Sequence, residues 1–282
     1  MAEIDLLPTI QNLLASSWVE IKAALVVYGV GLGIEYFLPA QKNQPVKDIM
    51  FNLVYTVIFL TVNMFLLHST EWIIAPIVEW AGGPLLQFSS GDGIGWELLF
   101  AFSFFAIFDL FYYWFHRFQH TSRILWVQHK FHHSEHSLNI TTGNRHHWLE
   151  GWFRIFLIII PMQLLIDLKF GSVGVIWATF MYWGYFIHLN LKLNLGPFTP
   201  VFAGPHLHRI HHSKLPQHQD KNFAAFFPIY DILFGTYLRP EKEEYPETGL
   251  ISGQDMNNLK DANFGPFLDW KKMLSQIKSG TP

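Results

Sequence analysis

The sequence predicts an all-α integral membrane protein with about four to five transmembrane helices and a cytoplasmic helical cap. Three observations predict this fold class: an apolar composition, apolar stretches of membrane-spanning length, and basic residues gathered on one side of those stretches. Half of the 282 residues are hydrophobic and only 15% are charged, whereas a soluble domain carries about a quarter charged residues. The mean hydropathy is positive, so the composition favours contact with lipid.

The charge and the cysteine count exclude several functional classes. A net charge of −3 provides no basic footprint for nucleic acid, so no nucleic-acid partner is expected. The absence of cysteine excludes disulfides, thiolate metal sites, cysteine nucleophiles and cysteine-ligated iron–sulfur clusters. The segment Met1–Ser17 has no early basic run and therefore does not resemble a cleaved signal peptide.

Five apolar stretches have about the length that a helix needs to cross a bilayer, which is about 20 residues. They are Ala23–Leu38, Met50–Leu67, Ile94–Phe115, Trp152–Leu168 and Phe170–Leu189. A further apolar stretch, Trp72–Phe88, is interrupted by Pro76 and by a later Gly-Gly-Pro run. Because proline and glycine break helices, we predict that this stretch is interfacial or re-entrant.

Basic residues predict the orientation, because cytoplasmic loops of membrane proteins are enriched in Lys and Arg. The segment His68–Glu97 contains neither residue, whereas the loop Gln41–Ile49 contains two lysines. Basic residues also follow the third span (Arg117, Arg123, Lys130, Arg145) and the fifth (Lys192, Arg209, Lys214, Lys221, Arg239). The N-terminus is therefore expected outside and the C-terminus in the cytoplasm. The alternative, a soluble all-α protein with buried helices, is disfavoured because one small domain cannot easily bury several such stretches.

The predicted organisation has three parts: an N-terminal segment over residues 1–22, a membrane-embedded domain over 23–240, and a C-terminal cytoplasmic tail over 241–282. In the tail, Phe264–Ile277 predicts an amphipathic helix that lies on the domain or on the membrane surface. The run Gly29-Val-Gly31-Leu-Gly33 lies inside a span, so close helix packing explains it better than a nucleotide-binding loop.

The histidines form the main candidate site. Of 15 histidines, 14 lie between His116 and His218. Three groups have the spacing i, i+3 or i+4, which places their members on one helix face: His116 and His120; His129, His132 and His133; His208, His211 and His212. All three groups follow a span on the predicted cytoplasmic side, so we expect them to converge there.

These groups predict a site for two metal ions, because eight imidazoles are too many ligands for one ion. Spacing alone leaves iron and zinc open. His147 and His188 are further predicted ligands, with His146 as the alternative to His147. Three flanking histidines are expected to neighbour the ligands or to lie on the surface: His136, His206 and His218.

Three acids are candidates for catalytic or orienting roles near the predicted metal site: Asp109, Glu135 and Asp231. A metal-bound histidine usually donates its second ring N–H to a carboxylate, a carbonyl or water. Asp109 precedes His116 by seven residues and is therefore expected on the same helix face. We expect these acids to orient ligands rather than to bind metal.

The segments Asp109–His120, His129–His133 and His208–His212 together resemble the fatty acid hydroxylase/sterol desaturase superfamily. The resemblance extends from about Ile107 to Tyr237. Details in His132-His133-Ser134-Glu135 and in Asp220-Lys221-Asn222-Phe223 look closest to its alkylglycerol monooxygenase-like branch. Gly184 stands where fatty acid 2-hydroxylases have a further histidine, which disfavours that branch.

The resemblance implies a di-iron centre (Fe2+/Fe3+), molecular oxygen as co-substrate, and an external electron donor of the cytochrome b5, ferredoxin or tetrahydrobiopterin type. It also implies hydroxylation or desaturation of a lipid: an ether lipid, a sterol or a fatty acyl chain. The implied ligands are the eight histidines of the three groups. The expected location is the bacterial inner membrane or the endoplasmic reticulum, with the active site on the cytoplasmic side and a separate redox partner. The sequence does not indicate the oligomeric state.

Two other functional classes remain as alternatives. A di-zinc hydrolase would normally carry His-Glu-x-x-His, which this sequence lacks. A haem-binding or metal-transporting protein would place its ligands within the spans, near the midplane, whereas these groups stand at span ends. Apolar substrate is expected to enter from the bilayer past aromatic residues such as Phe105, Tyr112, Trp183 and Phe186.

Overall fold

The computed structural model describes residues 6–86, 93–166 and 170–279, and the fold of this part is all-helical, as predicted. The long helices are α1 (Leu6–Phe37), α2 (Val46–Trp80), α3 (Ile94–Thr121), α7 (Phe170–Ile187) and α10 (Leu259–Ser279). The shorter α-helices are α4 (Arg123–His133), α5 (Glu150–Arg154), α6 (Ile160–Leu165), α8 (Pro205–His211) and α9 (Ile229–Leu233). A 3-10 helix, η1, spans Ile140–Asn144, and a π-helical segment, η2, spans Ile155–Ile159.

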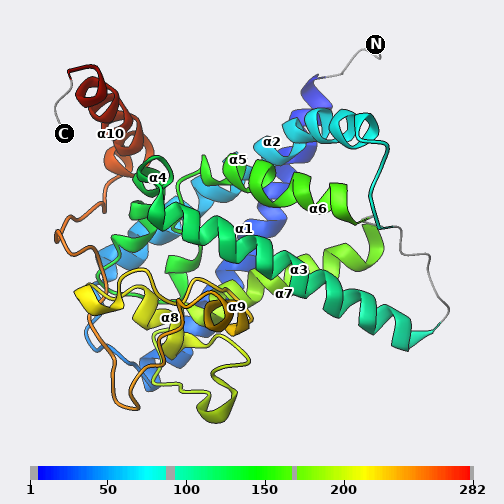
Figure 1. Cartoon of the computed structure of the whole chain (residues 1–282). Coiled ribbons are helices and arrows are strands. Elements are labelled where there is room, and N and C mark those ends of the chain that lie inside the picture. The colour runs from blue at the N-terminus through cyan, green and yellow to red at the C-terminus, as the bar shows by residue number, and fades with distance from the viewer. Residues whose placement is uncertain (1–5, 87–92, 167–169, 280–282) are drawn as a thin grey trace.

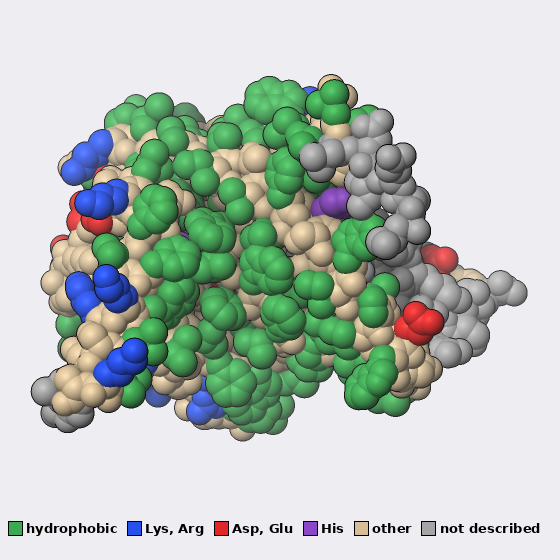
Figure 2. All heavy atoms as spheres, turned by 90° about the horizontal axis from the view of Figure 1, so that it is seen from above, with side chains coloured by type: hydrophobic (Ala, Val, Ile, Leu, Met, Phe, Trp, Pro, Cys, Tyr) green, Lys and Arg blue, Asp and Glu red, His purple; other side chains and the backbone are tan. Residues whose placement is uncertain are grey.

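Three helical segments are long and apolar enough to cross a membrane: Leu7–Phe37, Val46–Trp80 and Gly95–Thr121. Large apolar side chains on them are exposed, for example Val26 at 67% and Phe102 at 62%. Figure 2 shows a broad hydrophobic surface across the middle of the molecule. A monomeric soluble protein rarely exposes a contiguous apolar surface of this kind, so the helices indicate an integral membrane protein.

The three long helices run back and forth between two ends of the molecule (Figure 1). Helices α4, α8, α9 and α10 gather at the end where α3 finishes, on the left of the view. Figure 2 shows most of the visible Lys and Arg side chains at this same left end. These four helices form the cap. It lies at the basic end of the molecule, as the distribution of Lys and Arg in the sequence predicts.

The second helix differs from the prediction. α2 continues through Pro76 to Trp80, whereas we expected a break near Pro76. A transmembrane helix tolerates proline where neighbouring groups compensate for the lost backbone bond. The helix ends where Gly82 and Gly83 adopt φ of 83° and 91°, and the Gly83 N–H donates to the Val78 carbonyl at 2.9 Å. The end of the predicted stretch, residues 87 and 88, lies outside the described residues.

The fourth and fifth predicted spans also differ in form. Residues 150–165 form α5, the π-helical segment and α6 in succession, and α7 has 18 residues. Neither is among the candidate spans of the described residues. The predicted turn between them includes residues 167–169, which lie outside the described part. That the chain also crosses the membrane at these two segments, and therefore five times in all, stays a prediction.

Aromatic packing fixes α4 against α2. Phe131 of α4 is fully buried, and its ring centroid lies 4.7 Å from that of Tyr55 on α2. The guanidinium of Arg145 lies 4.4 Å from the centre of the same ring. Since Phe131 is surrounded by histidines in the sequence, this packing sets the rotation of α4 and hence the direction in which its histidines point.

The glycine run of α1 contributes one close contact. A Cβ atom at Gly31 would collide with the side chain of Ile140 in η1, whereas a Cβ atom at Gly29 or Gly33 would meet nothing within 4 Å. The prediction of close helix packing is therefore confirmed for Gly31. This contact brings α1 against the segment that leads from α4 to α5.

The substitution Gly31→Val should lower the thermal stability of the protein in detergent, because overpacking a close contact costs about 1–3 kcal/mol. Gly33→Val is the matched control, since it makes the same change one half-turn further along the same helix in open space. Differential scanning fluorimetry would compare the two melting temperatures. Equal melting temperatures for the two variants would contradict the assigned contact.

Candidate metal centre

Nine histidines converge in two adjacent clusters. Within each cluster, one ring nitrogen from every histidine lies within 4.8 Å of those of the others. The five-histidine cluster contains His116, His120, His129, His133 and His211, and the four-histidine cluster contains His132, His188, His208 and His212. These nine are the eight histidines of the three sequence groups and the predicted His188.

Three helices position eight of these side chains through their periodicity, and His188 directly follows the end of α7. The last turns of α3 present His116 and His120 to the five-histidine cluster. Helices α4 and α8 each supply both clusters, because positions three and four apart share a face that lies between the two. The rings of His133 and His212, which belong to different clusters, stack with centroids 4.4 Å apart. The two clusters therefore form one centre with two subsites.

The nitrogen spacing suits metal coordination. The Nε2 atoms of His116 and His129 lie 3.1 Å apart, and those of His188 and His208 lie 3.0 Å apart. Two imidazole nitrogens bound at right angles to one ion at about 2.1 Å would be separated by about 3.0 Å. The observed separations therefore match ligands on a shared ion.

The hydrogen bonds of His116 and His129 suit a metal ion between the two rings. The Nδ1–H of His116 donates to the Phe223 carbonyl at 2.7 Å, and Nδ1 of His129 faces the Glu150 carboxylate at 3.4 Å. A carbonyl and an ionised carboxylate only accept hydrogen bonds, so both imidazoles carry their proton on Nδ1. When both rings are neutral, the two Nε2 atoms then present lone pairs to each other, an arrangement that a bound metal ion would stabilise.

His211 gives a second indication of a missing positive partner. Its Nδ1–H donates to the Lys221 carbonyl at 2.7 Å, which leaves a lone pair on Nε2. That Nε2 is buried and has no hydrogen-bond partner. A buried polar atom without a partner is costly, and metal coordination would remove this cost. The histidines therefore fit a metal ion in the five-histidine cluster.

Burial keeps these imidazoles neutral, which is the form that binds metal. Burial lowers the pKa of His211 to about 3, and burial together with the neighbouring histidines holds the pKa of His133 and His212 well below the usual range. Their lone pairs are therefore available at neutral pH.

The loop between α8 and α9 presents the carbonyls that orient His116 and His211. Asp220 and Asn222 both adopt φ of 58°, a left-handed conformation that Asp and Asn tolerate better than most residues. The carboxylate of Asp231 accepts hydrogen bonds from the backbone N–H groups of Phe223 at 2.7 Å and Ala224 at 2.9 Å. Asp231 thus fixes the loop without facing a cluster itself.

The other two predicted acids also contact other parts of the protein rather than the clusters. Asp109 of α3 accepts from the backbone N–H groups of Ala225 at 3.2 Å and Phe227 at 2.6 Å. Glu135 accepts from the Asn52 side chain at 2.8 Å and lies 3.7 Å from the Arg145 guanidinium. Both carboxylates are fully buried. The structure therefore places all three predicted acids where they hold the segments that carry or orient the ligands.

Glu150 is a site residue that the sequence reasoning missed. Its carboxylate accepts from Nδ1 of His146 at 3.1 Å and lies 3.4 Å from Nδ1 of His129, and Arg154 donates to it at 2.5 Å. Burial raises the pKa of Glu150, but His146, Arg154 and His129 outweigh this effect and hold the pKa well below the usual range. The spacing i, i+4 from His146 and to Arg154 was the available signal.

The structure does not bring His147 to either cluster. Its Nε2 contacts the Asn263 carbonyl at 3.1 Å, and its Nδ1 accepts from the Leu149 backbone N–H at 3.2 Å. His146, the alternative, stacks on His132 with ring centroids 4.1 Å apart and forms a third potential metal-binding group with His129 and Glu150. His146 is therefore the member of the pair that adjoins the centre.

Two of the flanking histidines lie outside both clusters, as expected. Nε2 of His206 donates to the Glu244 carbonyl at 2.7 Å, and Nε2 of His218 lies 3.1 Å from the Glu244 carboxylate. The ring of His206 stacks on Tyr245 with centroids 4.2 Å apart. These contacts attach the segment after residue 240 to α8 and to the loop that carries His218.

The comparisons with known proteins agree with this geometry. Residues 101–236 match the protein family described as fatty acid hydroxylase. Alkylglycerol monooxygenase of Xenopus tropicalis is 35% identical over 136 residues, covering 48% of this chain and 30% of that protein. An ornithine lipid hydroxylase of Rhizobium tropici is 32% identical over 140 residues, covering 48% of this chain and 40% of that protein. A Delta(7)-sterol 5(6)-desaturase of Gibberella zeae is 28% identical over 173 residues, covering 59% and 46%.

The chain therefore spans less than half the length of each of these curated relatives. No solved structure matches it.

Metal analysis should find two ions per chain in the wild type and about one in the double variant His208→Ala/His212→Ala, because the four-histidine cluster would keep only two imidazoles. The matched control is His206→Ala/His218→Ala, which removes two histidines outside both clusters and should retain two ions. Inductively coupled plasma mass spectrometry after gel filtration would give these counts. A single ion in the wild type, or equal losses in both double variants, would contradict the two-site assignment.

The metal-free protein should lose stability as the pH falls below about 6.5. The folded pKa of His211 is about 3, against an ordinary value of 6.5, so the unfolded chain binds more protons between these pH values. Stability that is fully present above pH 6.5 is therefore lost progressively toward pH 3. Thermal melts of chelator-treated protein across this range would test it, and a melting temperature that rises on acidification would be the opposite result.

Proposed function

We propose that this chain, which belongs to the fatty acid hydroxylase superfamily, is a membrane-bound, oxygen-dependent di-iron oxidoreductase that hydroxylates a C–H bond of a lipid. The observation that supports this most is the pair of adjacent histidine clusters, whose inward nitrogens carry lone pairs. The bound irons would supply the redox chemistry that reduces O2 and oxidises the C–H bond.

The protein's own residues would prepare the site for this chemistry. The carbonyls of Phe223 and Lys221 hold two imidazoles in one tautomer, and the Gly184 carbonyl does the same for His188, whose Nδ1 lies 2.6 Å from it. The ligands are buried, which excludes water and so protects an oxidising centre from side reactions. Positioning and dehydration are therefore the contributions that the geometry supports.

An aromatic row beside the centre suits an apolar chain. The ring of Tyr112 lies 5.5 Å from that of His116 and 5.5 Å from that of Phe180, and Phe180 lies 5.6 Å from Phe105. Tyr112 and Phe105 of α3, with Phe180 of α7 between them, lead from the five-histidine cluster toward the middle of α3. We propose that the alkyl or acyl chain of the substrate lies along this row, which includes Phe105 and Tyr112 of the predicted lining.

Hydroxylation is favoured over desaturation by the relatives. The two more similar of the three relatives described above carry the names monooxygenase and hydroxylase, at 35% and 32% identity, and the desaturase is 28% identical. The relatives named as acting on an alkylglycerol and on an ornithine lipid both favour a membrane lipid as the substrate class. The basic residues at the cap end favour the cytoplasmic side for the site.

The test is lipid mass spectrometry on membranes of an expression host with and without the protein. Hydroxylation predicts a lipid that gains the mass of one oxygen in the presence of the wild type and of His206→Ala/His218→Ala, but not of His208→Ala/His212→Ala. A lipid that loses two hydrogens would instead indicate desaturation. Stoichiometric zinc with no lipid change, after reconstitution with iron and a reductant, would exclude the oxidoreductase and favour the di-zinc alternative.

A further inference from the structure

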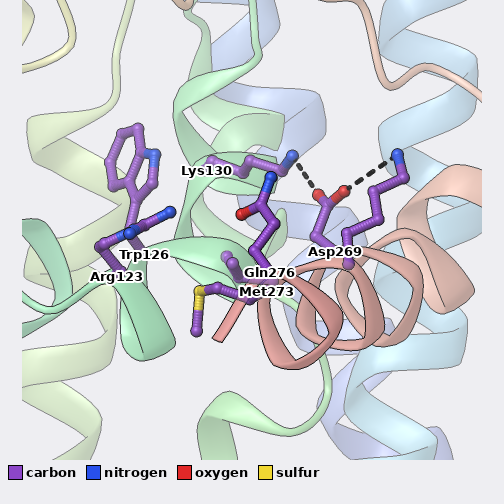
Figure 3. Close-up of a pocket in the computed structure, with 8 residues that line it drawn as sticks. Arg123, Trp126, Lys130, Asp269, Met273 and Gln276 are labelled. Atoms are coloured by element: carbon purple, nitrogen blue, oxygen red, sulfur yellow. Dashed lines mark hydrogen bonds and ion pairs between the residues drawn. The ribbon is translucent and has the colours of Figure 1, made fainter. Parts of the chain in front are cut away.

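We propose that the groove between α4 and α10 is the docking surface for a small acidic electron-transfer protein, and that Trp126 conducts electrons from this surface to the five-histidine cluster. This inference rests on the proposed function, because an oxidoreductase of that kind must receive electrons from outside. The groove has a volume of about 260 Å³ and is lined by residues of both helices. Figure 3 shows Lys130 of α4 reaching toward Asp269 of α10, with Arg123 and Trp126 of α4 on the other side of the view.

Trp126 links the groove to the metal centre. Its side chain is half-buried and lines the groove. Its ring centroid lies 5.1 Å from that of His120 and 5.6 Å from that of His133, both in the five-histidine cluster. An aromatic ring in van der Waals range of two ligands and also open to the groove offers a short path for an electron.

The charge of the groove suits an acidic partner. Three cationic residues line it, Arg123, Lys130 and Lys272, against one acid, Asp269. Asp269 lies 2.5 Å from Lys130 and 3.7 Å from Lys272, so a single carboxylate is shared by two ammonium groups. Lys272 remains 77% exposed. Excess positive charge at the mouth of a groove attracts and orients a negatively charged protein.

The helix that completes the groove is held at the cap. The indole N–H of Trp270 donates to the Ile124 carbonyl of α4 at 2.9 Å, and Ala262 at the start of α10 is fully buried. The groove is therefore a preformed surface, which lowers the ordering cost of binding a partner. This placement also gives a role to the C-terminal amphipathic helix that the proposed active site does not use.

The electron balance defines what the partner must deliver. Hydroxylation follows R–H + O2 + 2 e− + 2 H+ → R–OH + H2O, in which O2 is reduced and the C–H bond is oxidised. A one-electron carrier would dock twice in each turnover, donate one electron each time through Trp126, and leave in its oxidised form. The protons come from solvent.

The experiment compares two reductants on the full-length, iron-loaded protein in neutral vesicles. One is a plant-type two-iron ferredoxin, an acidic one-electron carrier kept reduced by its reductase, and the other is dithionite, a small molecule that needs no docking. The variant Arg123→Glu/Lys272→Glu should lower kcat/KM for ferredoxin by about tenfold or more, with less dependence on salt, and leave dithionite-driven lipid oxidation unchanged. Lys242→Glu, an exposed cation away from the groove, is the control and should behave as the wild type.

The role of Trp126 in electron transfer is tested by measuring kcat and KM separately. Trp126→Leu should lower kcat with ferredoxin and leave the KM for ferredoxin unchanged, because docking is intact and transfer is slower. Trp126→Phe should restore much of the rate, because it restores an aromatic ring. Metal content is measured in both variants, and equal metal content ensures that a lower rate does not reflect a damaged cluster.

Several results would overturn the proposal. They are turnover of the wild type with dithionite but not with ferredoxin, an equal loss in the Lys242→Glu control, and a kcat of Trp126→Leu equal to that of the wild type. A loss in Arg123→Glu/Lys272→Glu that is the same with both reductants and appears only in anionic vesicles would assign the groove to lipid headgroups instead. Failure of the proposed function is distinguishable, because no lipid would be oxidised with either reductant.

Discussion

The metal centre depends on one arrangement: buried imidazole nitrogens that carry lone pairs point toward one another. The Nδ1 protons of His116 and His211 are committed to backbone carbonyls, so their Nε2 atoms must face the cluster without a proton. Such an arrangement is unfavourable in a buried site unless a cation occupies it. The ends of α3, α4 and α8 are brought together at this point, so metal binding and the folding of the cap are coupled.

Buried acids hold the segments that carry or orient the histidines, without facing the clusters as ligands themselves. Asp109 and Asp231 hold the loop that carries the orienting carbonyls, and Glu135 holds the end of α4 through Asn52 and Arg145. Among these buried acids, Glu150 lies against a cluster histidine, His129, and against His146, which adjoins the centre. A polar network of this kind fixes side-chain directions before any substrate binds, which is how a protein keeps a metal centre rigid. The proposed substrate row meets the centre at His116, and the proposed electron path meets it at His120 and His133.

The sequence allowed the three histidine groups to be predicted, because spacings of three and four place residues on one face regardless of the tertiary fold. The all-helical class could also be predicted, from the length of the apolar stretches. The choice between His146 and His147 was not, because adjacent residues point in different directions and the turn after η1 decides which one faces His132. The continuation of α2 through Pro76 could not be predicted either, since local propensity favours a break and only the surrounding structure determines whether the helix continues. The spacing of four residues from Glu150 to His146 and to Arg154 was visible in the sequence, but the contact of Glu150 with His129 is made only by packing.

The central claim is that the two histidine clusters hold two irons with imidazole ligands. X-ray absorption at the iron edge, on protein loaded anaerobically with iron, tests it most directly. The account predicts two irons per chain, a nitrogen-dominated first coordination shell at about 2.0–2.2 Å, and the outer-shell scattering typical of several imidazole rings on each metal. A first shell dominated by carboxylate or water oxygen with little imidazole scattering, or sites that accept zinc and exclude iron, would contradict it.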